Sequence, residues 1–359
     1  MLHKHDAEAV AGWRPGDHPR SVKTGRTNEE VALSPSSVWH GDRPASEAEV
    51  RVGWDPPTPD ELEALGRMGE SGTWLLQGRP LKLTNLDKEI FPGKKDRPSV
   101  TKRDLVRYYA TVAPVMLPHL VGRPVNLHRF PDGVDRPGFW HNQPPSYAPE
   151  WITRWEDHFV VDSVPALAWM ANYAAVELHA WTSRIPDVDE PTWALVDIDP
   201  GPATSPEEVL LLARLFRDGL AHLRVAAAPK VSGQRGIHIW IPVAPGYTFS
   251  ETSAWVEKLS RAVGATVPDL VSWTWHKEAR GGKARLDYTQ NARNKTLVAP
   301  YSTRPAPGAP VSAPIRWEEL DDPSLRSDAW TVATMPTRLA EVGDLFAGLS
   351  GRAQRLPEL

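Results

Sequence analysis

Two aspartates, Asp197 and Asp199, stand at the end of an apolar run, 193–199, which a Pro-Gly pair terminates. Because side chains alternate along a strand, both carboxylates would project from one face with their Cα atoms about 6.5–7 Å apart. Unpaired charges at the end of an apolar strand are costly to desolvate. The pair is therefore a candidate metal site, and a convergence of carboxylates of this kind is what two-metal nucleotidyl transfer needs, with its two ions roughly 3.5–4 Å apart. A capping or surface pair is the alternative.

A third carboxylate, Asp287, lies in the segment 283–289. If this segment is a strand, Asp287 shares one face with Lys283, Arg285 and Thr289, which places an acid in a row of cations. Asp287 is thus a candidate third metal ligand, and a cross-strand ion pair is the alternative.

The run 230–238 contains residue types that suit a phosphate-binding loop. Ser232, Arg235 and backbone N–H groups beside two glycines can cradle phosphate, although the run lacks the Gly-Lys-Ser/Thr of a Walker loop. His238 follows on a predicted strand, 237–241. A plain hairpin with a satisfied, half-buried histidine is the alternative.

Two further places could contact nucleic acid. Lys102 stands in the first turn of a predicted helix, where the helix dipole disfavours a cation unless an anion is bound there. Phe139 and Trp140 follow a Pro-Gly pair, where exposed rings could stack on bases at roughly 1–3 kcal/mol each. An exposed lysine without a role and aromatic core burial are the respective alternatives.

Cap signals and apolar spacing predict the elements that position these residues. Thr58, Thr101 and Ser205 each precede a capping pattern, which predicts helices over 59–68, 102–116 and 206–223. An apparent strand pair occupies 74–77 and 81–84. The third helix directly follows the strand that carries the two aspartates.

Composition narrows the chemistry. The 359 residues include no cysteine, so metal ligands must be carboxylate, imidazole or carbonyl groups, which favours Mg or Mn. A signal peptide and an apolar stretch of membrane-spanning length are both lacking, which predicts a cytoplasmic protein without membrane contact. Scattered charge and Gly/Pro/Ser breaks predict that residues 1–54 are a disordered extension. Residues 55–348 are predicted to form one domain, followed by a tail over 349–359.

The net charge of −4 hides a basic segment. Residues 1–80 hold 9 Lys and Arg against 13 Asp and Glu, so the acidity lies entirely in the N-terminal part. Residues 276–304 carry seven cations against two acids. Such a segment fits nucleic-acid binding, and an ordinary solvated face is the alternative.

Seven segments, in this order, resemble the polymerase domain of bacterial ligase D, a member of the archaeo-eukaryotic primase superfamily that acts in non-homologous end joining. They are 83–92, 101–110, 117–134, 167–181, 193–201, 230–243 and 286–304. The resemblance covers roughly residues 55–348. It implies an α+β fold whose primase-like catalytic core has mixed and antiparallel sheets flanked by helices.

The resemblance also implies residue roles. Two divalent ions, Mn or Mg, would be bound by Asp197, Asp199 and Asp287, which are the catalytic residues. An NTP or dNTP would be bound by His179, Ser232, Arg235, His238, Gln290 and Arg304. DNA would contact Lys88, Lys102, Arg129, Phe139, Trp140 and Arg280, with Lys88 and Lys102 on a 5′-phosphate at a gap or overhang.

The chain departs from the family pattern at several positions. Arg235 stands where some relatives have Lys, and His128 and Asn142 stand where Lys is common, while the stretch 92–98 is longer than usual. No lysine begins the Lys-x-Asp-Gly adenylation motif of a ligase. We therefore expect a monomeric polymerase, associated with the nucleoid, without ligase activity, acting beside Ku and a separate ATP-dependent ligase.

Two other functions stay open on the residues alone. A non-catalytic adapter for DNA ends could keep the fold and the 5′-phosphate site. A metal-dependent phosphohydrolase could use the same aspartates.

Overall fold

The computed structural model describes residues 54–349 and 351–359, except the side chain of Lys277. The chain divides into the units Met1–Trp54 and Asp55–Leu359, and the second is described here. The predicted extension lies outside the described residues apart from Trp54. In the part that is described, no helix is long and apolar enough to cross a membrane.

The second unit begins with a capped helix and a hairpin. In α2 (Pro59–Arg67), Thr58 and Glu61 form the predicted capping box. Strands β1 (Gly72–Leu76) and β2 (Arg79–Leu83) pair antiparallel through a tight turn at Gln77 and Gly78, both with positive φ. The predicted helix and strand pair are confirmed, with ends shifted by at most two residues.

The first large sheet is built around β5 (Pro124–Arg129). Strands β6 (Phe139–His141) and β8 (His158–Val160) pair with one edge of β5, and β9 (Ala175–Ala180) pairs with the other. Strand β7 (Arg154–Trp155) extends the sheet beyond β8. Helices α3 (Lys102–Met116) and α4 (Val164–Asn172) pack on each other, and α4 contacts β9. A short pair, β3 (Glu89–Phe91) and β4 (Val100–Thr101), precedes α3.

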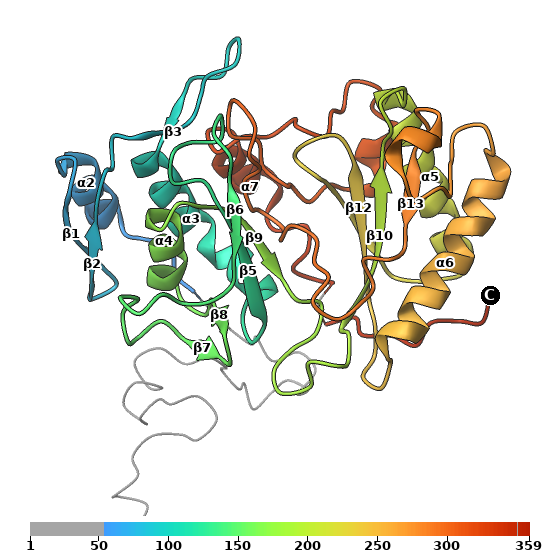
Figure 1. Ribbon diagram of the computed structural model, residues 1–359, viewed down its shortest axis with the longest axis horizontal. Helices are drawn as coiled ribbons and strands as arrows, with labels where there is room; N and C mark the ends of the chain where they lie inside the picture. The colour runs from blue at the N-terminus through green and yellow to red at the C-terminus, as the bar shows by residue number, and fades with distance from the viewer. Residues whose placement is uncertain (1–53, 350) are drawn as a thin grey trace, which may run out of the picture. The chain divides into compact units, whose positions relative to one another are not determined.

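The second sheet carries the aspartates. Its antiparallel order is β11 (Ala228–Val231), β12 (Ile237–Pro242), β10 (Trp193–Asp199) and β13 (Arg285–Asp287). Helices α5 (Pro206–His222) and α6 (Phe249–Thr266) pack against β10 and each other, on the right of Figure 1. Strand β10 is apolar because it lies inside the sheet and under these helices. The predicted helix after it is confirmed, including the Ser205 cap.

One segment after β13 joins the two sheets. The Ala299 N–H donates to the Leu178 carbonyl of β9 at 2.9 Å, and the Leu178 N–H donates to Ser302 Oγ at 3.0 Å. Farther along, the Val231 N–H of β11 donates to the Ala313 carbonyl at 2.9 Å. Residues 299–313 therefore hold β9 and β11 at fixed positions on either side of the segment. The short helices η3 (Leu117–His119), η4 (Lys277–Arg280), η5 (Trp317–Asp321) and α7 (Met335–Val342) complete the unit.

The residues predicted to form a tail are bonded to this unit. Leu349 packs in a core cluster with Trp193 and Leu195. The Ala244 N–H donates to the Gln354 carbonyl at 2.8 Å, and Trp255 Nε1 donates to the Pro357 carbonyl at 2.8 Å. The C-terminal residues thus lie against α6 and the end of β12.

Candidate active site

Strand register brings the three predicted carboxylates together. Asp197 lies directly opposite Asp287 of β13 and, on its other side, opposite His238 of β12. Asp199 lies opposite Arg285. Directly paired residues of an antiparallel sheet project from the same face. Asp197, Asp199 and Asp287 therefore share one face, with a histidine on one flank and an arginine on the other.

Strand β13 is shorter than the segment 283–289. Only Arg285–Asp287 pairs as a strand, so Lys283 and Thr289 lie outside the row that a strand over the whole segment would have formed. The Thr289 N–H and Oγ1 both donate to Asp287 Oδ1, at 3.0 and 2.6 Å. A side chain that hydrogen-bonds the backbone two residues on makes a local turn, which ends the strand.

The negative charge is least compensated at Asp197. Burial, followed by the charges of Asp199 and Asp287, raises the pKa of Asp197 to about 7, although Lys230 and Arg304 oppose the shift. Asp199 pairs with Arg280 at 3.0 Å and Asp287 with Arg285 at 3.4 Å.

Among the described residues, no three His, Asp or Glu side chains are already arranged as ligands of one metal ion. The donors are nevertheless suitable for Mg or Mn, because these ions prefer carboxylate oxygens. A cation beside Asp197 would also relieve the mutual repulsion of the three carboxylates. The donor set therefore fits the implied metals.

His238 is buried and bonded from both sides. Lys230 Nζ lies 2.8 Å from His238 Nδ1, while His238 Nε2 lies 3.5 Å from Asp197 Oδ1. Burial lowers the pKa of Lys230 well below its usual value. When Lys230 is charged it can only donate, which makes Nδ1 the acceptor and leaves the ring proton on Nε2. Burial, then the nearby cations, lowers the pKa of His238 well below 6.5, so the ring is neutral. With Lys230 charged, the ring directs an N–H toward the carboxylates.

The glycine-containing loop forms one wall of a cavity of about 310 Å³. Ser232 Oγ accepts from the Gly236 N–H at 3.0 Å, and Arg235 donates to the Gly201 carbonyl at 2.7 Å. At Gly233, where φ is +77°, a Cβ would lie 2.6 Å from the Arg304 side chain, so only glycine fits. Seven predicted site residues line the cavity: His179, Asp197, Asp199, Ser232, Arg235, His238 and Arg304.

Asp287 and Gln290 lie beside this cavity rather than on its wall. Gln290 Nε2 donates to Asp287 Oδ2 at 3.3 Å. In this structure Gln290 therefore supports a carboxylate, and the prediction that it completes the nucleotide pocket stays a prediction.

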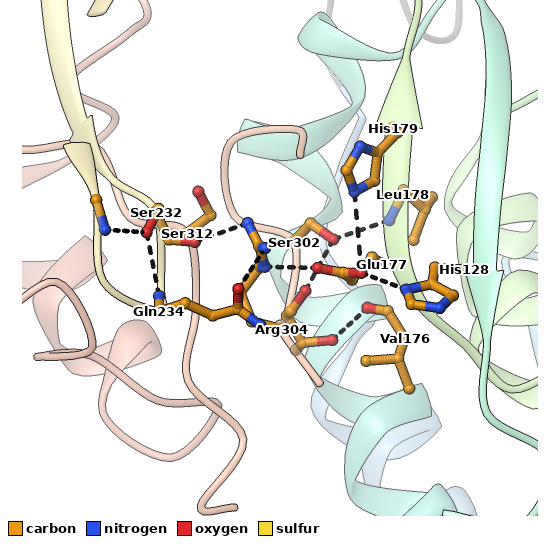
Figure 2. Close-up of polar contacts among 12 residues, drawn as sticks. His128, Val176, Glu177, Leu178, His179, Ser232, Gln234, Ser302, Arg304 and Ser312 are labelled. Atoms are coloured by element: carbon orange, nitrogen blue, oxygen red, sulfur yellow. Dashed lines mark hydrogen bonds and ion pairs between the residues drawn. The ribbon is translucent and has the colours of Figure 1, made fainter. Parts of the chain in front are cut away.

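Arg304 connects the loop of the second sheet to β9 of the first, as Figure 2 shows. Its Nη1 donates to the Ser232 carbonyl at 3.1 Å, and its Nη2 donates to Gln234 Oε1 at 2.9 Å. On the other side, its Nε lies 2.5 Å from Oε1 of Glu177. Arg304, which is predicted to bind the nucleotide, therefore also bridges the two sheets.

Glu177 is a site residue that the sequence reasoning missed. Its Oε2 lies 2.6 Å from His128 Nδ1 and 4.0 Å from His179 Nε2, in addition to the Arg304 contact. Burial opposes ionisation, but Arg304 and His128 more than offset it and hold the pKa of Glu177 below its usual value. The signal was an acid inside the otherwise apolar run 175–178, since an unpaired buried charge is costly.

The predicted 5′-phosphate clamp forms a separate cluster of cations. Lys102 is only 6% exposed, so the alternative of an exposed lysine without a role is wrong. The backbone N–H of Lys102 donates to the Lys88 carbonyl at 2.8 Å, and the side-chain Nζ of Lys88 pairs with Asp132 at 2.8 Å. Burial, and then the charges of Lys88 and Arg129, lowers the pKa of Lys102 to about 8. An anion in this cluster would offset the repulsion.

This pKa gives a testable pH dependence. The Lys102 ammonium is charged near pH 6.5 and half deprotonated near pH 8. The preference for DNA with a 5′-phosphate over DNA with a 5′-hydroxyl should therefore fall progressively as the pH rises from 7 through 9. Fluorescence anisotropy of the two DNAs measures this preference. Lys102→Met should give a small, flat preference, and an unchanged profile in that variant would refute the assignment.

Phe139 and Trp140 are 46% and 56% exposed, so the alternative of core burial is wrong. The ring of Trp140 stacks on His128, with centroids 4.5 Å apart and planes 7° apart. The Arg129 guanidinium lies 5.1 Å from the Phe139 ring centroid. His128, which replaces a common lysine of the family pattern, therefore supports the aromatic pair instead of adding charge.

Comparisons with known proteins identify the family of this chain. A family model described as "LigD, primase-polymerase domain" matches residues 101–346, which is more than half of the chain. The chain belongs to the LigD primase-polymerase family. The family resemblance inferred from the sequence is therefore confirmed.

Two LigD proteins are similar to this chain over about three quarters of its length. The multifunctional non-homologous end joining protein LigD of Mycobacterium bovis is 35% identical over 76% of this chain and 37% of that protein. The bifunctional LigD of Bacillus subtilis is 30% identical over 74% of this chain and 43% of that protein. The chain thus spans about two fifths of the length of these relatives.

A solved structure confirms the fold class. The polymerase domain of Mycobacterium tuberculosis ligase D, in complex with DNA, has a TM-score of 0.68 and is 33% identical. The match covers 76% of this chain and 99% of the mycobacterial domain. The fold is therefore α+β and primase-like, with antiparallel sheets flanked by helices.

Proposed function

We propose that this LigD-family chain is a DNA-dependent primase-polymerase that adds ribo- or deoxyribonucleotides to DNA 3′ ends during end joining. The observation that carries the proposal is the register of β10 and β13, which places Asp287 opposite Asp197 beside the cavity of the Ser232 loop. A cluster of acids with one incompletely neutralised member, next to a cation-lined cavity, suits a metal-bound triphosphate.

The chain's own residues supply binding and orientation. Arg235 and Arg304 face the triphosphate with charges, and Ser232 with a hydroxyl, while His238 offers the proton on Nε2 as a neutral donor. Two ions bound by Asp197, Asp199 and Asp287 would lower the pKa of the attacking 3′-hydroxyl and neutralise the leaving pyrophosphate. Arg280 lies at Asp199 and orients this carboxylate.

On the DNA side, Lys88 and Lys102 bind a 5′-phosphate across the gap, and Phe139 and Trp140 stack beside the template base. Both lysines precede or begin α3, on the side of the first sheet. Arg129 supports the Phe139 ring and adds positive charge between the aromatic pair and the clamp.

The cellular setting is part of the proposal. Because the relatives are named as non-homologous end joining proteins, we infer that the chain acts on broken DNA beside Ku and an ATP-dependent ligase. We propose a monomer in the bacterial cytoplasm, associated with the nucleoid.

The decisive assay uses a one-nucleotide gap with a 5′-phosphate, each NTP or dNTP, and Mn or Mg. We expect the 3′ strand to be extended by one nucleotide matching the template base, and extension to stop when the metal is chelated. Denaturing electrophoresis measures the product length. Tight binding without extension in either metal would support the end-binding adapter instead, and shortening of the DNA or release of phosphate would support the hydrolase.

A further inference from the structure

One exposed aromatic ring beside the carboxylates has no role in the site described so far. The described residues include six exposed large hydrophobic side chains: Leu75, Phe139, Trp140, Tyr147, Trp275 and Leu359. Trp275, 62% exposed, is the one of these that lies next to the second sheet's acidic face. It lies two residues before the start of η4 and contacts β13, whereas Phe139 and Trp140 belong to β6 of the other sheet (Figure 1).

The backbone at Trp275 is tied directly to a catalytic carboxylate. Arg280 Nη2 donates to the Trp275 carbonyl at 3.0 Å and Nε donates to the Thr274 carbonyl at 3.1 Å. The same guanidinium donates from Nη1 to Asp199 Oδ2 at 3.0 Å. Trp275 is therefore held at a fixed position relative to Asp199 despite standing in a loop.

The indole ring is also supported by a cation. The Arg285 guanidinium lies 4.7 Å from the centroid of the Trp275 ring, and the same group lies 3.4 Å from Asp287. Arg285 is buried, whereas the indole remains largely exposed. The ring thus covers Arg285 and leaves an open aromatic surface beside the carboxylates. Rigid, exposed aromatic rings next to cations are the usual stacking surface for nucleic-acid bases.

We propose that Trp275 stacks on the base at the 3′ end of the strand to be extended. This rests on the proposed function, in which the 3′-hydroxyl must reach the metal at Asp287. The cavity for the triphosphate is lined by residues of β9, β10, β12, the Ser232 loop and the segment 297–304, and its lining does not include Asp287. The hydroxyl therefore approaches from the β13 side, where Trp275 lies.

The test measures DNA binding separately from catalysis. Anisotropy gives the affinity of the wild-type chain, Trp275→Leu, Trp275→Phe and Trp151→Leu for gapped DNA whose terminal 3′ nucleotide is either intact or abasic. Leu still covers Arg285 but cannot stack, whereas Phe can. Trp151 is a matched control, because the Arg79 guanidinium lies 4.5 Å from the centroid of its ring. Arg79 belongs to β2 and not to the sheet that holds the aspartates.

We expect the wild type to bind intact DNA about tenfold more tightly than abasic DNA, which is within the range of one base stack. Trp275→Leu should lose this difference, while Trp275→Phe and Trp151→Leu should keep most of it. If Trp275→Leu weakens both DNAs equally, the ring only covers Arg285 and the proposal is wrong. Absence of an intact-versus-abasic difference in the wild type would also overturn it.

Failure of the proposed function gives a different pattern. Nucleotide addition by the wild-type chain on the same intact DNA is measured in parallel. If addition is absent while the base-dependent binding difference persists and disappears in Trp275→Leu, the polymerase proposal fails and the stacking surface remains.

Discussion

Asp197→Asn should abolish nucleotide addition and at the same time stabilise the metal-free protein. Asn keeps the shape of Asp197 but cannot carry the negative charge that holds a metal ion, so we expect the rate of addition to fall by about 10³-fold or more. The same change removes a carboxylate that is destabilised by burial and by Asp199 and Asp287. We expect the melting temperature in chelator at pH 8 to rise by a few degrees.

The pH dependence of this stabilisation follows from the direction of the shift. The pKa of Asp197 is raised from 3.8 to about 7 in the folded chain, so the folded state binds the proton more tightly than the unfolded state. The ionised carboxylate therefore opposes folding increasingly from about pH 4 to pH 7, and by a constant amount above pH 7. The advantage of Asn should be largest at pH 8 and shrink toward pH 4.5, where differential scanning fluorimetry can follow it.

The matched control is Asp157→Asn, which changes an exposed aspartate in the turn between β7 and β8. It should leave both nucleotide addition and the melting temperature within error of the wild type. If Asp197→Asn instead lowers the melting temperature in chelator, Asp197 is structural and its assignment as a strained metal ligand fails.

Glu177→Ala should cause the largest loss of stability among single changes at the site. It leaves Arg304 and His128 without their carboxylate partner inside the protein. Breaking a buried ion pair by removing one partner costs about 3–5 kcal/mol. We expect the melting temperature to fall by roughly 10 °C. The KM for the nucleotide should also rise, because Glu177 positions the guanidinium that reaches the Ser232 loop.

A double variant separates stability from function. Replacing both partners, in Glu177→Met with Arg304→Met, leaves no buried unpaired charge, so we expect much of the lost stability to return. The high KM should persist, because the cation that faces the nucleotide is gone. A Glu177→Ala protein that melts like the wild type would contradict the bridging role, and a double variant with a normal KM would contradict the nucleotide-binding role of Arg304.

The sequence predicted the local elements well where the signal is local. Each of the helices α2, α3 and α5 begins at its predicted cap, and β10 has the predicted bounds, because capping boxes and apolar periodicity depend on residues three or four positions apart. The sequence could not predict the length of β13, because Asp287 itself turns the chain back through Thr289.

By itself, the sequence determined which residue types were available: hard oxygen ligands without cysteine, two acids on one face of a strand, and a small-residue loop followed by a histidine. Only the tertiary structure decided their partners. Strand register placed Asp287 and His238 on either side of Asp197, 90 and 41 residues away in the chain. The folded unit also buried Lys102, aligned Glu177 with Arg304, and left Trp275 exposed over Arg285. These outcomes depend on contacts between distant segments, which local periodicity does not encode.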